Sequence, residues 1–145
     1  MEIVIKHYTK LSVDELYTVL QARSDVFVIE QKCIYRDLDD KDKNAYHVMV
    51  FDNGKLCAYC RVLDRGVIYD DVCISRVITL VRKKGYGKIL IDSAISIAKE
   101  KYNANCIIIG AQVQAKGFYQ KCGFKEYGDI FLEDGIDHIH MKMIL

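Results

Sequence analysis

A glycine-rich turn between an apolar strand and a long amphipathic helix constrains the fold of this chain more than any other feature. The run VCISRVITL has the β-branched composition of a strand, and the turn RKKGYGK follows it closely. After the turn, Leu90, Ala94 and Ile97 recur at helical spacing, and NCIIIGA has the apolar pattern of a buried strand. A strand–helix–strand unit of this kind predicts a sheet that is covered by helices.

The remaining segments add hairpins and shorter helices to this unit. YHVMVFD and KLCAYCRVL flank the pair Asn53-Gly54, which is typical of a two-residue hairpin turn. EIVIK reads as a first strand, and a helix begins at Ser12, where Ser12 and Glu15 form the S-x-x-E pattern of a capping box. The whole order is β, α, α, β, β, β, α, β, α, β, β. It predicts an α/β (α+β) fold with a mixed sheet and helices on both faces.

Length and charge set limits on the class of protein. The 145 residues predict one domain, spanning 1–145. A formal net charge of +1 argues against a broad polyanion surface, so we expect no nucleic-acid or membrane partner and only a local anion site. No signal peptide is apparent, and no apolar run is long enough to cross a membrane. Five of the six cysteines lie in hydrophobic segments, which indicates reduced core residues and a cytoplasmic protein.

Two patterns that could indicate metal or redox chemistry are weak here. Cys57 and Cys60 form a C-x-x-C, but residues three apart on a strand point to opposite faces. His138 and His140 share a strand face and have no third ligand at useful spacing, so we expect no metal site. Cys122 reads as a packing residue rather than a nucleophile.

The turn RKKGYGK has the features of an anion site. Free N–H groups at the start of a helix converge on one point, and the helix dipole reinforces them. Gly85 and Gly87 allow a phosphate to approach the backbone, and the cations around them are Arg82, Lys83, Lys84 and Lys88. A phosphate or pyrophosphate ligand is therefore expected, with a plain basic surface turn as the alternative. The spacing fits neither the P-loop nor the dinucleotide fingerprint.

The pattern R-x-x-G-x-G, from Arg82 to Gly87, resembles the acetyl-CoA signature of the Gcn5-related N-acetyltransferase (GNAT) superfamily. The segment GAQVQAKGFYQKCGF is similar to the second acetyl-CoA element of that superfamily. RSDVFVIEQ, the acidic loop after it and EDGIDH near the C-terminus resemble its ElaA-like subgroup. Two details depart from the pattern: Thr79 is followed almost directly by Arg82, and Gln112 stands where Asn is frequent.

The resemblance implies a fold and an activity. The sheet would be mostly antiparallel and splayed at its central cofactor-binding strands. The chain would transfer the acetyl group of acetyl-CoA to a primary amine of a small molecule or peptide, by direct attack in a ternary complex. A non-catalytic acyl-CoA-binding module and an ATP-binding protein remain alternatives. The expected partners are acetyl-CoA and an amine acceptor, and a homodimer is left open.

The resemblance also assigns residues to the cofactor. The backbone of Val77, Ile78 and Thr79 would pair with the pantetheine arm, and the N–H of Ile78 would stabilise the oxyanion. Gln112 and Phe118 would line the pantetheine and thioester end. The pyrophosphate would lie on the glycine-rich turn, whose residues are Arg82, Lys83, Lys84, Gly85, Tyr86, Gly87 and Lys88.

Tyr119 matches the position of the general acid that is frequent in the superfamily. A phenol near the sulfur can protonate the departing thiolate, and the alternative reading is a core aromatic. The sequence does not identify the base. Glu30 is the first candidate and His138 and His47 are the next, and each also has a structural reading as a surface, capping or packing residue.

Two charged features stand outside these motifs. The acidic loop RDLDDKDKN is expected to be exposed, either as a solvated turn or as an attraction for a cationic acceptor. Its carboxylates are Asp37, Asp39, Asp40 and Asp42. Arg76 lies within an apolar strand, and because an unpaired buried charge is costly, we expect it to pair with a carboxylate.

Overall fold

The computed structural model describes residues 1–145, and its centre is a seven-stranded sheet in the order β1-β2-β3-β4-β5-β7-β6. Only β4 and β5 are parallel, and all other neighbouring strands are antiparallel. The mixed, mostly antiparallel sheet is therefore confirmed. The strands are β1 (Glu2–His7), β2 (Tyr46–Asp52), β3 (Lys55–Leu63), β4 (Val72–Thr79), β5 (Cys106–Gln112), β6 (Lys125–Glu133) and β7 (Ile136–Ile144).

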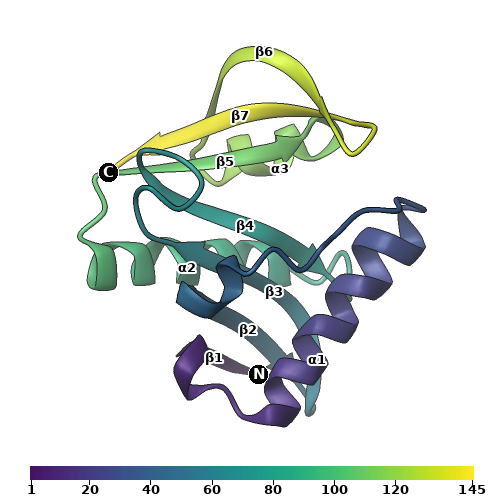
Figure 1. Cartoon of the computed structure of the whole chain (residues 1–145). Coiled ribbons are helices and arrows are strands. Elements are labelled where there is room, and N and C mark those ends of the chain that lie inside the picture. Colours follow the sequence, from purple (N-terminus) through teal and green to yellow (C-terminus); the bar gives the residue numbers. More distant parts are fainter.

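Helices cover both faces of the sheet, as Figure 1 shows. On one face, α1 (Val13–Arg23) continues into the π-helix η2 (Ser24–Glu30), and Val19 packs in one core with Tyr59 of β3. On the other face lie α2 (Tyr86–Tyr102) and α3 (Lys116–Lys121), and Leu90 packs in a larger core with Cys60. None of these helices combines the length and the apolar character that crossing a membrane would require. Three short 3₁₀ turns complete the chain: η1 (Tyr8–Lys10), η3 (Lys41–Asn44) and η4 (Val113–Ala115).

Local sequence signals fix the ends of several elements. Ser12 and Glu15 form a complete capping box, in which each side chain accepts a hydrogen bond from the backbone of the other. Asn53 and Gly54 both have positive φ, 51° and 74°, as a two-residue hairpin turn of the favoured hand requires. Gly123, with φ of 102°, ends α3. The hairpin and the two helix boundaries are confirmed.

The sheet opens at its centre because β4 bends away from β5. Tyr59 pairs with Ile78 and Arg61 with Ser75, so two residues of β4, Arg76 and Val77, stand opposite one residue of β3. This is a β-bulge, and Arg76 within it has a left-handed φ of 54°, an unfavourable conformation for a residue with a Cβ.

Pairing between β4 and β5 is confined to Val72 with Ile107 and Cys73 with Ile108. Beyond these pairs the two strands diverge toward their carboxyl ends, where α2 and α3 begin (Figure 1). The splayed sheet is confirmed, and ligands of open sheets bind outside such carboxyl ends.

Candidate functional site

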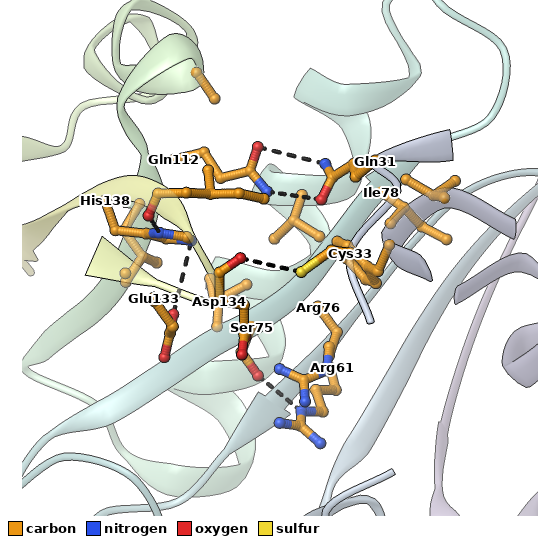
Figure 2. A pocket seen from close by; sticks show the side chains of 18 of the residues that line it. Gln31, Cys33, Arg61, Ser75, Arg76, Ile78, Gln112, Glu133, Asp134 and His138 are labelled. Carbon is orange, nitrogen blue, oxygen red and sulfur yellow. Dashed lines mark hydrogen bonds and ion pairs between the residues drawn. The ribbon is translucent and has the colours of Figure 1, made fainter. Parts of the chain in front are cut away.

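A cavity of about 720 Å³ lies where β4 and β5 separate. Its walls come from residues 26–41, from β3 and β4, from β5 with the start of α3, and from the β6–β7 turn (Figure 2). It reaches Phe27, which packs with the α1 core, and Tyr119, which packs with the α2 core, so it passes through the sheet. Of the candidate residues, the cavity is lined by Val77, Ile78, Thr79, Arg82, Gln112, Tyr119 and His138.

The glycine-rich turn presents free backbone donors beside this cavity. The N–H groups of residues 82–88 make no backbone hydrogen bond, whereas the next one, that of Ile89, donates to the carbonyl of Gly85. Gly85 is the N-cap of α2 with φ of 79°, and Lys83 is also left-handed, with φ of 64°. The turn therefore holds several donors at the positive end of a long helix, which is the arrangement that binds phosphate groups.

The side chains of the turn differ in their partners. Arg82 is exposed and forms an ion pair of 2.7 Å with Glu30, and Lys88 pairs with Asp92 at 2.6 Å. Lys83 and Lys84 have no ion-pair partner and remain exposed. Two positive charges are thus free to meet an anionic ligand.

Tyr86 contributes its backbone N–H to the turn, whereas its side chain binds elsewhere. Its hydroxyl donates a short hydrogen bond to Asp52 at the end of β2, and this bond raises the pKa of Tyr86 to about 12. The side chain therefore ties the start of α2 to the β2–β3 hairpin.

Gly87 is needed for a packing reason as well as for phosphate access. A Cβ at Gly87 would lie 3.1 Å from the ring of Phe118 in α3 and 3.9 Å from the methyl group of Thr79. Phe118 itself does not line the cavity, but packs between Gly87 and the ring of Tyr119. The two sequence elements assigned to the cofactor thus meet at this contact.

The hydrogen-bond pattern of β4 corrects the expected role of Ile78. The Leu80 N–H donates to the carbonyl of Cys57, which makes Thr79 and Ala58 the non-hydrogen-bonded pair of the ladder. The backbone groups of Thr79 therefore face the split, and those of Ile78, one residue earlier, face β3. Ile78 contributes its buried side chain to the cavity, not a free N–H.

Tyr119 is buried at the α3 side of the cavity, 8% exposed, and its hydroxyl has no hydrogen-bond partner within the chain. Burial raises the pKa of Tyr119 above its usual value, so the phenol stays protonated at neutral pH. A protonated hydroxyl that borders a cavity and has no partner is able to donate a proton to a ligand there.

Two contacts join the segment just after η2 to the second half of the sheet along the cavity (Figure 2). The amides of Gln31 and Gln112 exchange hydrogen bonds of 3.2 and 3.4 Å. The thiol of Cys33 donates to the carbonyl of Asp134 in the β6–β7 turn, at 3.1 Å. The expected Gln112 thus reaches the site, and Gln31 is a partner that the sequence did not indicate.

The acidic loop is not an exposed acidic surface, so its expected exposure as a solvated turn was wrong. Asp37 and Asp42 are buried, and Asp39 is mostly covered. Each carboxylate contacts two arginines, because Arg23, Arg61 and Arg76 project toward the loop from α1, β3 and β4. The pairs are Arg23–Asp37 at 3.0 Å, Arg23–Asp42 at 2.6 Å, Arg61–Asp39 at 2.8 Å, Arg61–Asp42 at 2.9 Å, Arg76–Asp37 at 2.8 Å and Arg76–Asp39 at 3.4 Å.

This ionic cluster of three arginines and three aspartates forms part of the cavity wall through Asp39, Arg61 and Arg76. Burial alone would raise the pKa of Asp39, but the hydrogen bond and charge of Arg61, with the charge of Arg76, hold it well below its usual value. The pairing expected for Arg76 is confirmed. Asp40 alone stays exposed, with its side chain 87% accessible.

The candidate bases separate clearly in space. Glu30 is half exposed, pairs with Arg82 and does not line the cavity, so the geometry does not support its expected catalytic position. His47 is fully buried between the Tyr59 hydroxyl and the Asp42 carbonyl, and burial lowers its pKa. His138 lines the cavity.

Comparison with known proteins gives one consistent family. The sequence model described as "Acetyltransferase (GNAT) domain" matches residues 6–145. A UPF0039 protein of Schizosaccharomyces pombe is 37% identical over 149 residues, which cover 100% of this chain and 98% of the relative. Protein ElaA of Escherichia coli is 35% identical over 139 residues, which cover 93% of this chain and 91% of ElaA.

Solved structures agree with this result. An acyl-CoA N-acyltransferase from Pseudomonas aeruginosa superposes with a TM-score of 0.90 at 34% identity, covering 99% of both chains. The crystal structure of Escherichia coli ElaA gives a TM-score of 0.90 at 33% identity, again with 99% of both chains covered.

Proposed function

The chain belongs to the GNAT acetyltransferase family, and on that premise we propose that it transfers the acetyl group of acetyl-CoA to a primary amine. Membership in the family supports an acyltransferase that uses acyl-CoA as its cosubstrate. The proposal adds the acetyl group, the amine acceptor and direct attack in a ternary complex. We further propose that residues 1–145 act as one catalytic domain, and six cysteines without a disulfide are compatible with a cytoplasmic location.

The observation that carries the proposal is the free edge of β4 between two features of matching chemistry. On one side lies the turn with unpaired N–H groups at residues 82–88, and on the other lies the unpaired hydroxyl of Tyr119. A ligand that is anionic at one end and reactive at the other, with an amide-containing arm between, fits this order. Acetyl-CoA has these three parts.

Each residue then has a role in binding. The turn binds the pyrophosphate through the N–H groups of residues 82–88, with the charges of Arg82, Lys83, Lys84 and Lys88 around it. The β4 groups that face the split, those of Thr79 first, pair with the amides of the pantetheine arm. Gln112 contacts the arm from β5, and Phe118 positions the turn through Gly87 rather than touching the ligand.

Acetyl-CoA, when bound, supplies an activated acyl group and a thiolate leaving group. The protein orients the thioester along β4, and N–H groups facing the split stabilise the negative oxygen of the tetrahedral intermediate. Tyr119 donates a proton to the sulfur as the carbon–sulfur bond breaks. No step requires a covalent bond to the protein.

The Tyr119→Phe variant tests this proposal, because it removes the hydroxyl and keeps the ring packing. We expect kcat to fall about 100-fold with acetyl-CoA affinity unchanged, measured by thiol release with a panel of amines and by calorimetry. Tyr17→Phe, on the exposed face of α1, is the matched control and should behave like the wild type. Binding of acetyl-CoA without thiol release for any amine would instead favour a non-catalytic acyl-CoA-binding module.

A further inference from the structure

His138 occupies a position that the binding roles above do not use. It lies in β7 opposite Gln112 of β5, it lines the cavity, and its side chain is 10% exposed. Its neighbours along the strand, Ile139 and Met141, point into the α2 core, so His138 points to the face that α1 and η2 cover. The imidazole is thus at the end of the cavity away from Tyr119 of α3.

The contacts of His138 determine which ring nitrogen is free (Figure 2). Nδ1 lies 2.7 Å from the carbonyl oxygen of Ile136, which only accepts hydrogen bonds, so Nδ1 carries the hydrogen. In the neutral ring, Nε2 therefore keeps its lone pair. Its nearest charged group is Glu133, at 3.7 Å, and Phe131 stacks on the ring, with centroids 5.7 Å apart. The orientation of the His138 ring is therefore fixed, and the lone pair of Nε2 is available to accept a proton.

The charged groups around His138 favour a cationic ligand at this end of the cavity. Glu133 and Asp134 line the cavity here, and neither is paired with an arginine or lysine. The other charged groups that line it, Arg36, Asp39, Lys41, Arg61, Arg76 and Arg82, come from the loop after η2, β3, β4 and the glycine-rich turn. Gln112, which faces His138 from β5, is an uncharged amide, and the thiol of Cys33 is engaged with the carbonyl of Asp134 in the β6–β7 turn.

Amine acylation needs proton transfer on two sides of one carbon atom. The incoming nitrogen must lose a proton, and the departing sulfur must gain one, so a single group cannot serve both without moving. Tyr119 packs in the α2 core, whereas His138 lies on the opposite face of the sheet, and both border one cavity. This is the arrangement that such a reaction requires.

We propose that His138 and Glu133 form the acceptor subsite, in which Glu133 attracts an alkylammonium ion and Nε2 of His138 takes its proton. This inference rests on the proposed function. The nitrogen lone pair then forms the bond to the acyl carbon, and the carbon–sulfur bond breaks. The thiolate takes the Tyr119 proton, and the proton that the nitrogen loses on collapse restores Tyr119 through solvent. One proton per turnover is released when His138 returns to its neutral form.

The decisive variant is His138→Asn, because the asparagine amide can still donate to the Ile136 carbonyl but cannot accept a proton at the position of Nε2. With an alkylamine acceptor we expect kcat/KM to fall about 100-fold while acetyl-CoA affinity is unchanged. With hydroxylamine, which is neutral at pH 7, the deficit should shrink to less than about tenfold, because no proton has to be removed before attack. In the variant, kcat/KM for the alkylamine should follow the fraction of free amine and rise with pH up to the pKa of the amine itself, because only amine that has lost its proton in solution can attack.

Two further variants keep the test informative if His138→Asn folds poorly. Glu133→Gln should raise KM for the alkylamine several-fold and raise KM for the neutral hydroxylamine by a smaller factor, because only the alkylammonium ion is attracted by the carboxylate. His140→Asn, on the same face of β7 but outside the cavity, is the control, and its activity should stay within about twofold of wild type. Thermal unfolding checks that each variant is folded.

The outcomes separate this inference from the proposed function. Equal losses of His138→Asn with both acceptors, or no loss with either, would overturn the role of His138 and leave the proposed function intact. A wild-type protein that binds acetyl-CoA but acylates no amine would overturn both.

Discussion

The glycine-rich turn at residues 82–88 and the acidic loop at residues 37–42 are the two most charged segments of the chain, and the fold treats them in opposite ways. The turn keeps Lys83 and Lys84 exposed and unpaired, with free N–H groups around them. The loop buries Asp37 and Asp42 against arginines from three other elements. The comparison teaches that a charged run indicates a ligand site only when the rest of the chain supplies no counter-charge.

The cost of removing a charge should differ most sharply within the acidic loop. Asp42→Asn leaves Arg23 and Arg61 without a shared carboxylate, and breaking a buried ion pair costs about 3–5 kcal/mol. We expect this loss in the free energy of unfolding, measured by urea denaturation. Asp40→Asn is the matched control, because Asp40 is exposed and pairs only with Lys43, so its effect should stay below about 0.5 kcal/mol. Similar losses for the two variants would contradict the distinction between buried and exposed carboxylates.

The pH dependence of stability should reveal the same cluster. The pKa of Asp39 is depressed in the folded state, whereas unfolded aspartate has a pKa of about 3.9. Its contribution is therefore fully present above about pH 5 and declines as the pH falls below about 4, where the unfolded chain binds the proton first. Urea midpoints between pH 6 and pH 3 should fall more steeply for the wild type than for Asp39→Asn. Parallel curves would show that Asp39 is not held ionised by its arginines.

Loss of charge in the turn should change binding and not stability. Replacing Lys83 and Lys84 with Gln removes two unpaired exposed cations, each of which contributes about 0.3–1 kcal/mol to binding an anion at low salt. We expect acetyl-CoA affinity to fall about threefold to 30-fold, measured by calorimetry, with the unfolding midpoint unchanged. The deficit should shrink as salt is added, because both lysines act through screened charge. An affinity loss that is independent of salt would argue against this role.

The smallest expected effect concerns Glu30, the residue whose assignment changed most. Glu30 competes with an anionic ligand for Arg82, so Glu30→Gln should leave kcat unchanged and improve acetyl-CoA affinity by up to about fivefold. Asp92→Asn frees Lys88, which is paired and exposed in the same way, and should improve acetyl-CoA affinity to a similar extent. A large drop in kcat for Glu30→Gln would restore Glu30 as the base and contradict the role given to His138.

Sequence patterns were sufficient wherever the controlling interaction is local. The capping box at Ser12, the Asn53-Gly54 turn and the C-terminal glycine of α3 each depend on residues within one turn, and each was predicted correctly. The start of α2 belongs to the same group, since Gly85 sits at the N-cap of the helix that the pattern predicted.

The features that the sequence did not reveal depend on partners far along the chain. Asp37 and Arg76 are 39 positions apart, and nothing near either residue indicates that they meet. The bulge at Arg76 shifts which backbone groups face the split, so the assignment of Ile78 required the strand register. The position of Glu30 likewise depends on Arg82, 52 positions away. Arg76 was the one residue whose sequence context indicated such a distant contact, because a charge within an apolar strand requires a carboxylate partner.

The contact between Gly87 and Phe118 has a consequence for how related chains can vary. With the Phe118 ring 3.1 Å from where a Cβ would stand, a larger residue at 87 requires either a shift of that ring or a smaller residue at 118. Substitutions at positions 87 and 118 are therefore coupled, although most of a helix and a whole strand separate the two residues along the chain. Pairs of changes at these positions are expected to be tolerated together where each alone is not.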